Sequence, residues 1–336
     1  MKRWLIATGL VVAMLAFGIG IYHTAAALKG DHKVIRRPTA ITASPLPGTM
    51  YVVQGGAVYR FHHGSFSQVT ADDGWMQPAA TPSGQLVAVK REENYSDLYL
   101  LSTSGRQVAQ LTHNSSPGSV ESNHWAFYPR LSPDGQTLFY AFDPKDPYND
   151  YRVDLAIFAS RVNTAAGPVA WTQPNQFTGG DVTPVPLKDG GLIYTKYSID
   201  DQSQVHSQVW IQRRAGSVGV ALTTADLGCS QPAISPDEKS VAMVCNRGSG
   251  QSAELDVASF DAASLTLGPP TTLVSSELVA SPAFAPDGKT IAFLAPARPG
   301  GGFQLWTANP SVAGSVRDIT TDLGLDSTSA PVWLAG

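Results

Sequence analysis

The sequence has few cysteines and few charged residues for a chain of 336 residues. Its two cysteines, Cys229 and Cys245, have no histidine nearby, and two thiolates alone do not make a structural zinc site. Charged residues make up 15% of the chain and the formal net charge is -4, so Lys and Arg give no surplus to neutralise phosphates. We therefore expect no nucleic acid as a partner, no metal ion and no other cofactor.

Long hydrophobic runs are absent except at the N-terminus. Lys2 and Arg3 precede a run over residues 4–22, which would span about 28 Å as a helix, close to the thickness of a bilayer core. Two interpretations remain open: an uncleaved membrane anchor, or a signal peptide cleaved near the small residues 25–27. No cysteine follows the run, which excludes lipoprotein attachment. We expect residues 1–22 to send the chain to the periplasm or cell surface, with residues 23–47 as a linker.

Glycine and proline, by contrast, are abundant, with 31 Gly and 24 Pro, which favours many short strands and turns over long helices. A block with two prolines four residues apart recurs, complete or in part, at intervals of 48 to 55 residues. A period near 50 is typical of one four-stranded propeller blade. The first prolines of the six blocks are Pro78, Pro129, Pro184, Pro232, Pro282 and Pro331.

Each block predicts a short strand and then a tight turn, because proline fixes φ and the Asp-Gly that follows supplies a positive φ. An apolar second strand comes next, as expected for sheets that pack between two neighbours. A third strand follows it. A short fourth strand ends on a recurring tripeptide, at 110–112, 176–178, 221–223 and 318–320.

The two ends of the chain complete one blade. Residues 49–70 predict a second, third and fourth strand with no proline block before them, and residues 330–334 are a proline block with no strands after it. Pairing the two closes the ring and removes exposed sheet edges. We therefore predict an all-β fold: a six-bladed β-propeller of four-stranded antiparallel blades over residues 48–336, closed by its C-terminal strand and preceded by an N-terminal transmembrane or signal helix.

The repeat resembles the TolB-type β-propeller repeat of the PD-repeat family, and residues 282–293 (PAFAPDGKTIAF) match it best. The resemblance covers residues 49–336 and is specific for the fold but weak for function. TolB carries an α/β domain ahead of its propeller, and we expect that domain to be missing here. Related blades form the propellers of prolyl oligopeptidase-like peptidases, but the G-x-S-x-G of their hydrolase domain does not occur in this sequence.

The two cysteines are expected to pair in the fifth blade. If its first hairpin turns around Asp237, Cys229 and Cys245 each lie eight residues from the tip and face each other. Opposed residues of an antiparallel pair lie about 4.5 to 5.5 Å apart at Cα, within the range for a disulfide. In an exported chain this favours a disulfide over two buried thiols.

The long connections of this strand order reach one face of the ring, opposite the tight proline-aspartate turns. Aromatic side chains interleaved with carboxylates on that face would suit a protein, peptide or sugar surface, although such rings also often pack over blade ends. A cation near residues 143–150 is disfavoured, because the spacing is not that of an EF-hand and Lys145 opposes it. The candidate binding face comprises Asp72, Trp75, Glu93, Tyr95, His124, Trp125, Asp146, Tyr148 and Tyr151.

The sequence favours a binding protein over an enzyme, and no catalytic residue is assigned. The leading hypothesis is an extracytoplasmic, non-catalytic binding or scaffolding propeller for a cell-envelope protein or peptide, held at the membrane through residues 4–22. One alternative is a hydrolase or lyase that uses carboxylates such as Glu92, Glu93 and Asp146 at the central pocket. The other is a sugar or small-molecule sensor.

Overall fold

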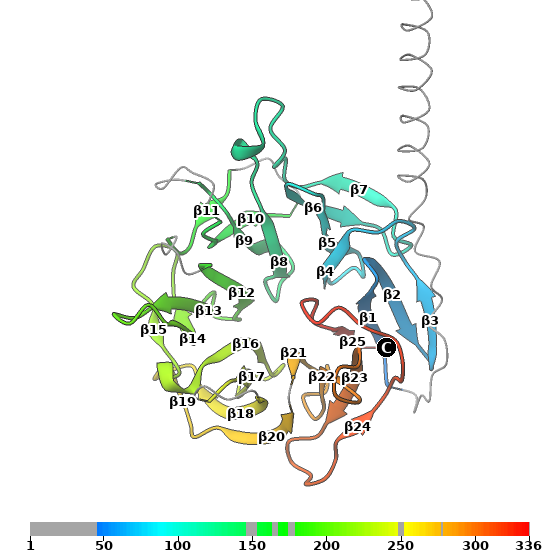
Figure 1. Ribbon diagram of the computed structural model, residues 1–336, viewed down its shortest axis with the longest axis vertical. Coiled ribbons are helices and arrows are strands. Elements are labelled where there is room, and N and C mark those ends of the chain that lie inside the picture. Colours follow the sequence, from blue (N-terminus) through cyan, green and yellow to red (C-terminus); the bar gives the residue numbers. More distant parts are fainter. Residues whose placement is uncertain are drawn as a thin grey trace, which may run out of the picture. The chain divides into compact units, whose positions relative to one another are not determined.

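The computed structural model describes residues 46–145, 153–162, 167–173, 179–247, 252–276 and 278–335. In this part of the chain, six antiparallel sheets surround a central axis, each with one strand innermost (Figure 1). The predicted all-β six-bladed propeller is therefore confirmed. Among the described residues, no helix has the length and apolar character needed to cross a membrane. The predictions for residues 1–22, and for the linker up to residue 45, lie outside the described residues.

The first three blades come from the N-terminal half of the propeller and from the C-terminal strand. From the axis outward, the first blade consists of β25 (Val332–Leu334), β1 (Thr49–Gln54), β2 (Ala57–His62) and β3 (Ser65–Gln68). The second consists of β4 (Trp75–Ala80), β5 (Leu86–Arg91), β6 (Ser96–Leu101) and β7 (Gln107–Gln110). After a 3₁₀ turn, η1 (Val120–Ser122), the third consists of β8 (Ala126–Leu131), β9 (Thr137–Phe142), β10 (Ala156–Arg161) and β11 (Val169–Ala170).

The other three blades follow in chain order. The fourth consists of β12 (Asp181–Pro186), β13 (Leu192–Ile199), β14 (Val205–Gln212) and β15 (Val220–Ala221), followed by the 3₁₀ turn η2 (Ala225–Leu227). The fifth consists of β16 (Cys229–Ile234), β17 (Ser240–Cys245), β18 (Ala253–Asp261), β19 (Thr266–Leu267) and β20 (Thr271–Ser276). The sixth consists of β21 (Ala280–Phe284), β22 (Ile291–Pro296), β23 (Phe303–Ala308) and β24 (Arg317–Asp318). The fifth sheet has one strand more than predicted, because the nine residues of β18 pair with both β19 and β20.

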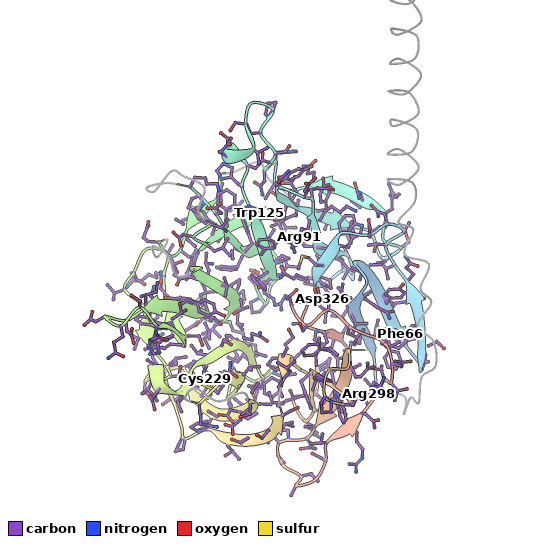
Figure 2. The ribbon with its side chains drawn as sticks, viewed as in Figure 1. Phe66, Arg91, Trp125, Cys229, Arg298 and Asp326 are labelled. Atoms are coloured by element: carbon purple, nitrogen blue, oxygen red, sulfur yellow. A yellow bond between two sulfur atoms is a disulfide. The ribbon has the colours of Figure 1, made fainter. Side chains whose placement is uncertain are left out.

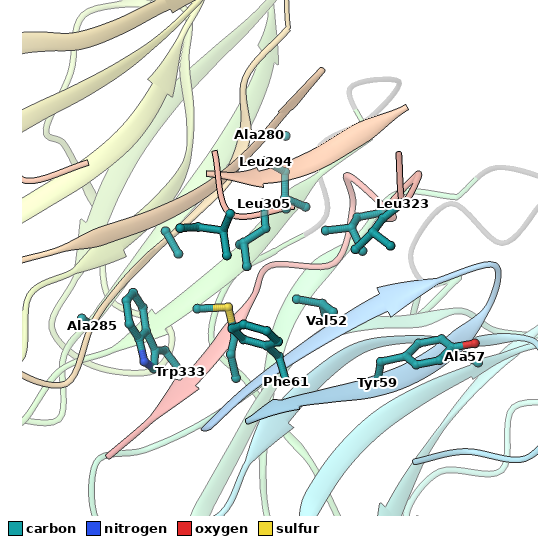
Figure 3. Close-up of a cluster of buried hydrophobic side chains, with 14 residues drawn as sticks. Val52, Ala57, Tyr59, Phe61, Ala280, Ala285, Leu294, Leu305, Leu323 and Trp333 are labelled. Carbon is teal, nitrogen blue, oxygen red and sulfur yellow. The ribbon is translucent and has the colours of Figure 1, made fainter. Parts of the chain in front are cut away.

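The C-terminal strand closes the ring. Met50 of β1 lies opposite Trp333 of β25 in an antiparallel register. Both side chains are buried in one cluster with Leu294 and Leu305 of the sixth blade (Figure 3). The Trp333 indole Nε1 donates a hydrogen bond to the carbonyl of Pro47 at 2.7 Å. The closure predicted from the two incomplete ends is confirmed, and the apolar seam is buried from both sides.

A β-bulge recurs in the inner strand of blades two to six. The residue before the first proline has a positive φ of 50° to 55° in every case, and in all five blades the strand register shifts by one across it. Such a conformation is costly for a residue other than glycine, so its surroundings must hold it. The bulge residues are Gln77, Tyr128, Thr183, Gln231 and Ser281.

The sequence placed the fourth strand of the third blade at 176–178, which lies outside the described residues, but the structure already has a fourth strand in this sheet. Its fourth strand is β11, earlier in the chain. Thr172, just after β11, accepts the N–H of Ile157 on its Oγ1 at 2.9 Å, in the way that Thr112 accepts the N–H of Leu98 at 2.9 Å in the second blade. The threonine of the recurring tripeptide therefore satisfies one donor of the third strand, and this role identifies the fourth strand.

The predicted disulfide is present in the fifth blade. Cys229 of β16 and Cys245 of β17 are register partners, with Cα atoms 4.0 Å apart and a bond between their sulfurs. Both side chains are fully buried in the cluster between the fourth and fifth blades. The disulfide therefore links the innermost strand of this blade to the next strand outward.

Candidate functional site

Trp75 of the candidate binding face lies in the core and not at the surface. Its side chain is 1% exposed and packs edge to face on Tyr99, with ring centroids 5.6 Å apart. Its indole Nε1 donates to Asp72 Oδ1 at 2.8 Å, and Lys90 Nζ donates to Asp72 Oδ2 at 2.6 Å. Desolvation would raise the pKa of Asp72, but these hydrogen bonds outweigh it and the pKa is lowered. Trp75 is therefore a core residue whose indole N–H holds Asp72 in the loop before β4.

Trp125, by contrast, is only half-buried and meets Arg91 at the seam of two blades. Its ring stacks on Phe127, with centroids 5.7 Å apart and an interplanar angle of 13°. The exposed Arg91, at the end of β5, places its guanidinium 6.0 Å from the centroid of the Trp125 ring (Figure 2). A cation over an exposed indole is worth about 0.5–1 kcal/mol. We call Arg91, Trp125 and Phe127 the Arg91–Trp125 patch.

The remaining described residues of the face surround this patch. A cavity of about 330 Å³ is lined by Asp73, Gly74, Lys90, Arg91, Glu92 and Glu93. Asp72 and Glu93 are exposed, whereas Tyr95 is half-buried. His124 is half-buried too, with its ring stacked on Phe142 at 5.2 Å and its Nδ1 2.7 Å from the carbonyl oxygen of Asp143. Asp146, Tyr148 and Tyr151 lie outside the described residues.

Several carboxylates near this face are buried and structural. Asp143 forms an ion pair with Lys145 at 2.7 Å, and Asp181 forms one with Lys196 at 3.3 Å. Desolvation raises the pKa of both carboxyls, and of the buried Asp97 as well. The carboxylate of Asp143, which a cation bound near residue 143 would need as a ligand, is thus already paired with Lys145. The described residues contain no group of three His, Cys, Asp or Glu side chains that could hold a metal ion.

Four of the five bulge residues donate a hydrogen bond to a side chain next to them around the central channel. A bulge leaves the N–H of its extra residue without a partner in the sheet, and at these four positions a side chain from outside the residue's own blade accepts it. Tyr128 N–H donates to Gln77 Oε1 at 2.7 Å, and Ser281 N–H donates to Gln231 Oε1 at 2.6 Å. We call this set of contacts the bulge ring. It also contains the bonds from Gln77 N–H to Ser329 Oγ (2.8 Å) and from Gln231 N–H to Thr195 Oγ1 (2.9 Å).

Two spaces that share several lining residues occupy the channel. A narrow one of about 80 Å³ lies inside the bulge ring, and a wider one of about 420 Å³ lies at the turn ends of the inner strands. Arg130 lines both. Among the described residues that line them there is no Asp or Glu, so the carboxylate pair required by the hydrolase or lyase alternative is not found in the channel lining.

Arg130 was not among the candidate site residues, although the sequence distinguishes it from its counterparts in the other blades. The residue after the first proline of each block is Ala or Val in five blocks and Arg130 in the third. All six of these residues line the wider space. Aligning the blocks position by position, and looking for the residue that departs from the repeat, would have found Arg130 without a structure.

The fold is shared with TolB propellers. It is similar to TolB from Acinetobacter baumannii, with a TM-score of 0.62 and 18% identity over 86% of this chain and 67% of that chain. It is also similar to a putative TolB from Agrobacterium tumefaciens, with a TM-score of 0.57 and 14% identity over 85% and 94% of the two chains. A chain in the crystal structure of a nidogen/laminin complex gives a TM-score of 0.60 and 10% identity over 84% and 97%.

Enzymes share this architecture too. Puromycin hydrolase gives a TM-score of 0.51 at 15% identity, with 39% of that chain covered, and oligogalacturonate lyase gives 0.52 at 14% identity, with 80% covered. No family model matches the sequence. No curated protein matches it either. At these identities the structural likeness shows the fold alone, and the function must be argued from the site.

Proposed function

We propose that this protein is an extracytoplasmic, non-catalytic binding or scaffolding propeller that engages a cell-envelope protein or peptide. The Arg91–Trp125 patch carries the proposal. It presents a guanidinium and an indole, the groups most enriched in interface hot spots, at the exposed ends of strands. Its backbone is held in place, because Arg91 N–H donates to the carbonyl of Gly74 and Asp143 N–H donates to that of Trp125. Exposed Glu92 and Glu93 supply a polar rim.

The proposed location has two supports. A disulfide between Cys229 and Cys245 is typical of proteins in oxidising compartments outside the cytoplasm. The basic residues and hydrophobic run of residues 1–22 would direct export, as an anchor or a signal peptide, and residues 23–47 would link this segment to the propeller at 48–336. The nidogen/laminin chain fits a protein-binding role for this architecture, since its structure was solved in a complex.

Chemical crosslinking on intact cells that express the full chain tests the proposal. The substitutions Trp125→Ala and Arg91→Glu should each lower the yield of the crosslinked partner about tenfold or more, because a hot-spot side chain contributes about 2 kcal/mol or more. Arg106→Glu is the matched control: it makes the same charge change in the exposed turn between β6 and β7, on the opposite face of the same blade. Its yield should equal that of the unchanged protein.

Two outcomes would count against the proposal. One is the absence of any crosslinked product from cells in which the folded protein is present at the surface or in the periplasm. The other is a product whose yield falls equally for Arg91→Glu and Arg106→Glu, since that would indicate a general charge effect and not a contact at the patch.

A further inference from the structure

Arg130 is the one charged residue in a ring of otherwise small or apolar side chains. It follows the bulge residue Tyr128 and Pro129 on β8, and its five counterparts in the other blades are Ala79, Val185, Ala233, Ala283 and Val332. All six line the wider part of the channel. The fold does not require an arginine in this position, because alanine or valine stands at the equivalent position of the innermost strand in every other blade.

Arg130 also lacks a counter-charge. Its Nη1 donates to the carbonyl of Pro129 at 3.0 Å, and no ion pair joins its guanidinium to a described Asp or Glu. Asp326, beside the channel in Figure 2, uses both carboxylate oxygens within its own loop, on Thr328 and Ser329. Burial lowers the pKa of Arg130 to about 10, which leaves it protonated at neutral pH. A half-buried cation without a partner costs folding free energy, and a bound anion would remove that cost.

The surroundings define the anion. Beyond Arg130, most residues that line the wider space are apolar, with Ile234, Phe284 and Trp333 among them, and Thr81 and Ser132 are the two hydroxyl side chains of the lining. No second Lys or Arg lines the space in the described part of the chain, so a single negative charge is matched and a phosphate dianion is not. The volume of about 420 Å³ falls in the range of small-molecule sites.

We propose that the channel binds a hydrophobic organic carboxylate, whose carboxylate pairs with the Arg130 guanidinium while its apolar body fills the space at the turn face. The carboxylate comes from either a free acid or the C-terminus of a peptide with apolar last residues. This site lies in the channel and is reached from the turn face, so it is independent of the proposed contact at the Arg91–Trp125 patch.

Isothermal titration of the full chain with matched acids and amides tests the site. Octanoate is compared with octanamide, and an acetylated Ala-Leu-Leu acid with its amide, so that each pair has the same apolar body and differs only in whether its polar end group is a charged carboxylate or a neutral amide. At least one acid should bind about tenfold or more tightly than its amide, as expected for loss of a charge-assisted hydrogen bond. Preference for octanoate indicates a free acid as the ligand, and preference for the peptide acid indicates a chain terminus.

The variant Arg130→Gln keeps a polar side chain and removes the charge. It should reduce the preference for acid over amide to less than about twofold while leaving the thermal midpoint of the free protein unchanged or higher, because the unpaired charge is gone. Arg106→Gln, in the turn between β6 and β7 outside the channel, should retain the full preference. Equal binding of acid and amide in both pairs, no binding in either pair, or an undiminished preference in Arg130→Gln would overturn the proposal.

Discussion

At the scale of single residues, the glutamine side chains before two of the inner-strand prolines, Gln77 and Gln231, join neighbouring blades. Gln77 shows this most fully: its own N–H donates to Ser329 Oγ of the closing segment, and its Oε1 accepts the N–H of Tyr128 in the next blade. The residue is 2% exposed, so water cannot easily replace either bond. One glutamine thus contributes hydrogen bonds to both of its neighbours around the channel.

Gln77→Ala should therefore lower the free energy of unfolding by about 1–3 kcal/mol, because the N–H of Tyr128 loses its acceptor. The measurement is urea denaturation followed by circular dichroism, with hydrogen exchange at the Tyr128 amide as a local readout that should become faster. Gln202→Ala, in an exposed loop, is the matched control and should change stability by less than about 0.5 kcal/mol. Equal losses in the two variants would mean that the bulge ring contributes no specific stability.

Residue roles were the part of this site that the sequence predicted least well. Trp75 and Trp125 are both aromatic residues next to acidic loops, yet one is a core residue that supports Asp72 and the other is half-exposed beside Arg91. The difference depends on the face of the sheet to which each indole points. Successive residues of a strand point to opposite faces, so a shift of one position exchanges a buried for an exposed indole. The local sequence does not determine the orientation of either indole. The departure of Arg130 from the repeat, by contrast, can be seen in the sequence alone.

At the scale of elements, the turn that follows each inner strand is stabilised by its own side chains. In the fifth blade Asp237 Oδ1 accepts from Ser235 Oγ at 2.6 Å and from Lys239 N–H at 3.1 Å. In the third blade Asp134 Oδ1 accepts from Ser132 Oγ at 2.5 Å and from Gln136 N–H at 3.0 Å. The hydrogen bonds from the serines, followed by those from the backbone, lower the pKa of both carboxyls.

These turn aspartates give a pH dependence with a defined sign. Because the folded-state pKa of Asp237 lies below the ordinary value of 3.8, its stabilising effect is present above that value and is lost as pH falls through the folded-state pKa. Asp237→Asn should therefore be less stable than the unchanged protein at pH 7, and the gap should narrow below about pH 4. Urea denaturation at pH 7, 5, 4 and 3 measures the difference in the free energy of unfolding between the variant and the unchanged protein. Asp134→Asn repeats the test at the equivalent turn of the third blade. A gap that stays constant over this range would contradict the argument.

Element order and the cysteine pair were predictable because they follow from the repeat, but register at the bulge was not. Cys229 and Cys245 face each other as expected from a hairpin centred on Asp237. Closer to the turn, however, Ala233 pairs with Ala242, so the register there is shifted by one residue. The bulge at Gln231 makes up the difference. The short fourth strands were predicted least reliably, since β11 has only two residues and little periodicity to detect.

At the scale of the whole molecule, ring closure depends on a strand of three residues. β25 pairs with β1 over Thr49, Met50 and Tyr51, and without it the inner edge of the first blade would be open. Trp333 is the one buried residue of this short strand and lies in a cluster with Leu305 of the sixth blade. Opening of the propeller should therefore begin where β25 pairs with β1, because there the two ends of the ring are joined by hydrogen bonds and packing and not by covalent continuity.

Trp333→Ala should lower the free energy of unfolding by about 3–5 kcal/mol, because it leaves a cavity in the seam and removes the hydrogen bond to the carbonyl of Pro47. Val218→Ala is the control: that side chain is 93% exposed, and its loss should have almost no effect. Hydrogen exchange should locate the change, with faster exchange at β1 amides than at those of β17, where the disulfide holds the blade together. If protection instead falls equally at β1 and β17, the ring opens as one unit and closure by β25 is not its weakest point, because a local seam would release β1 first.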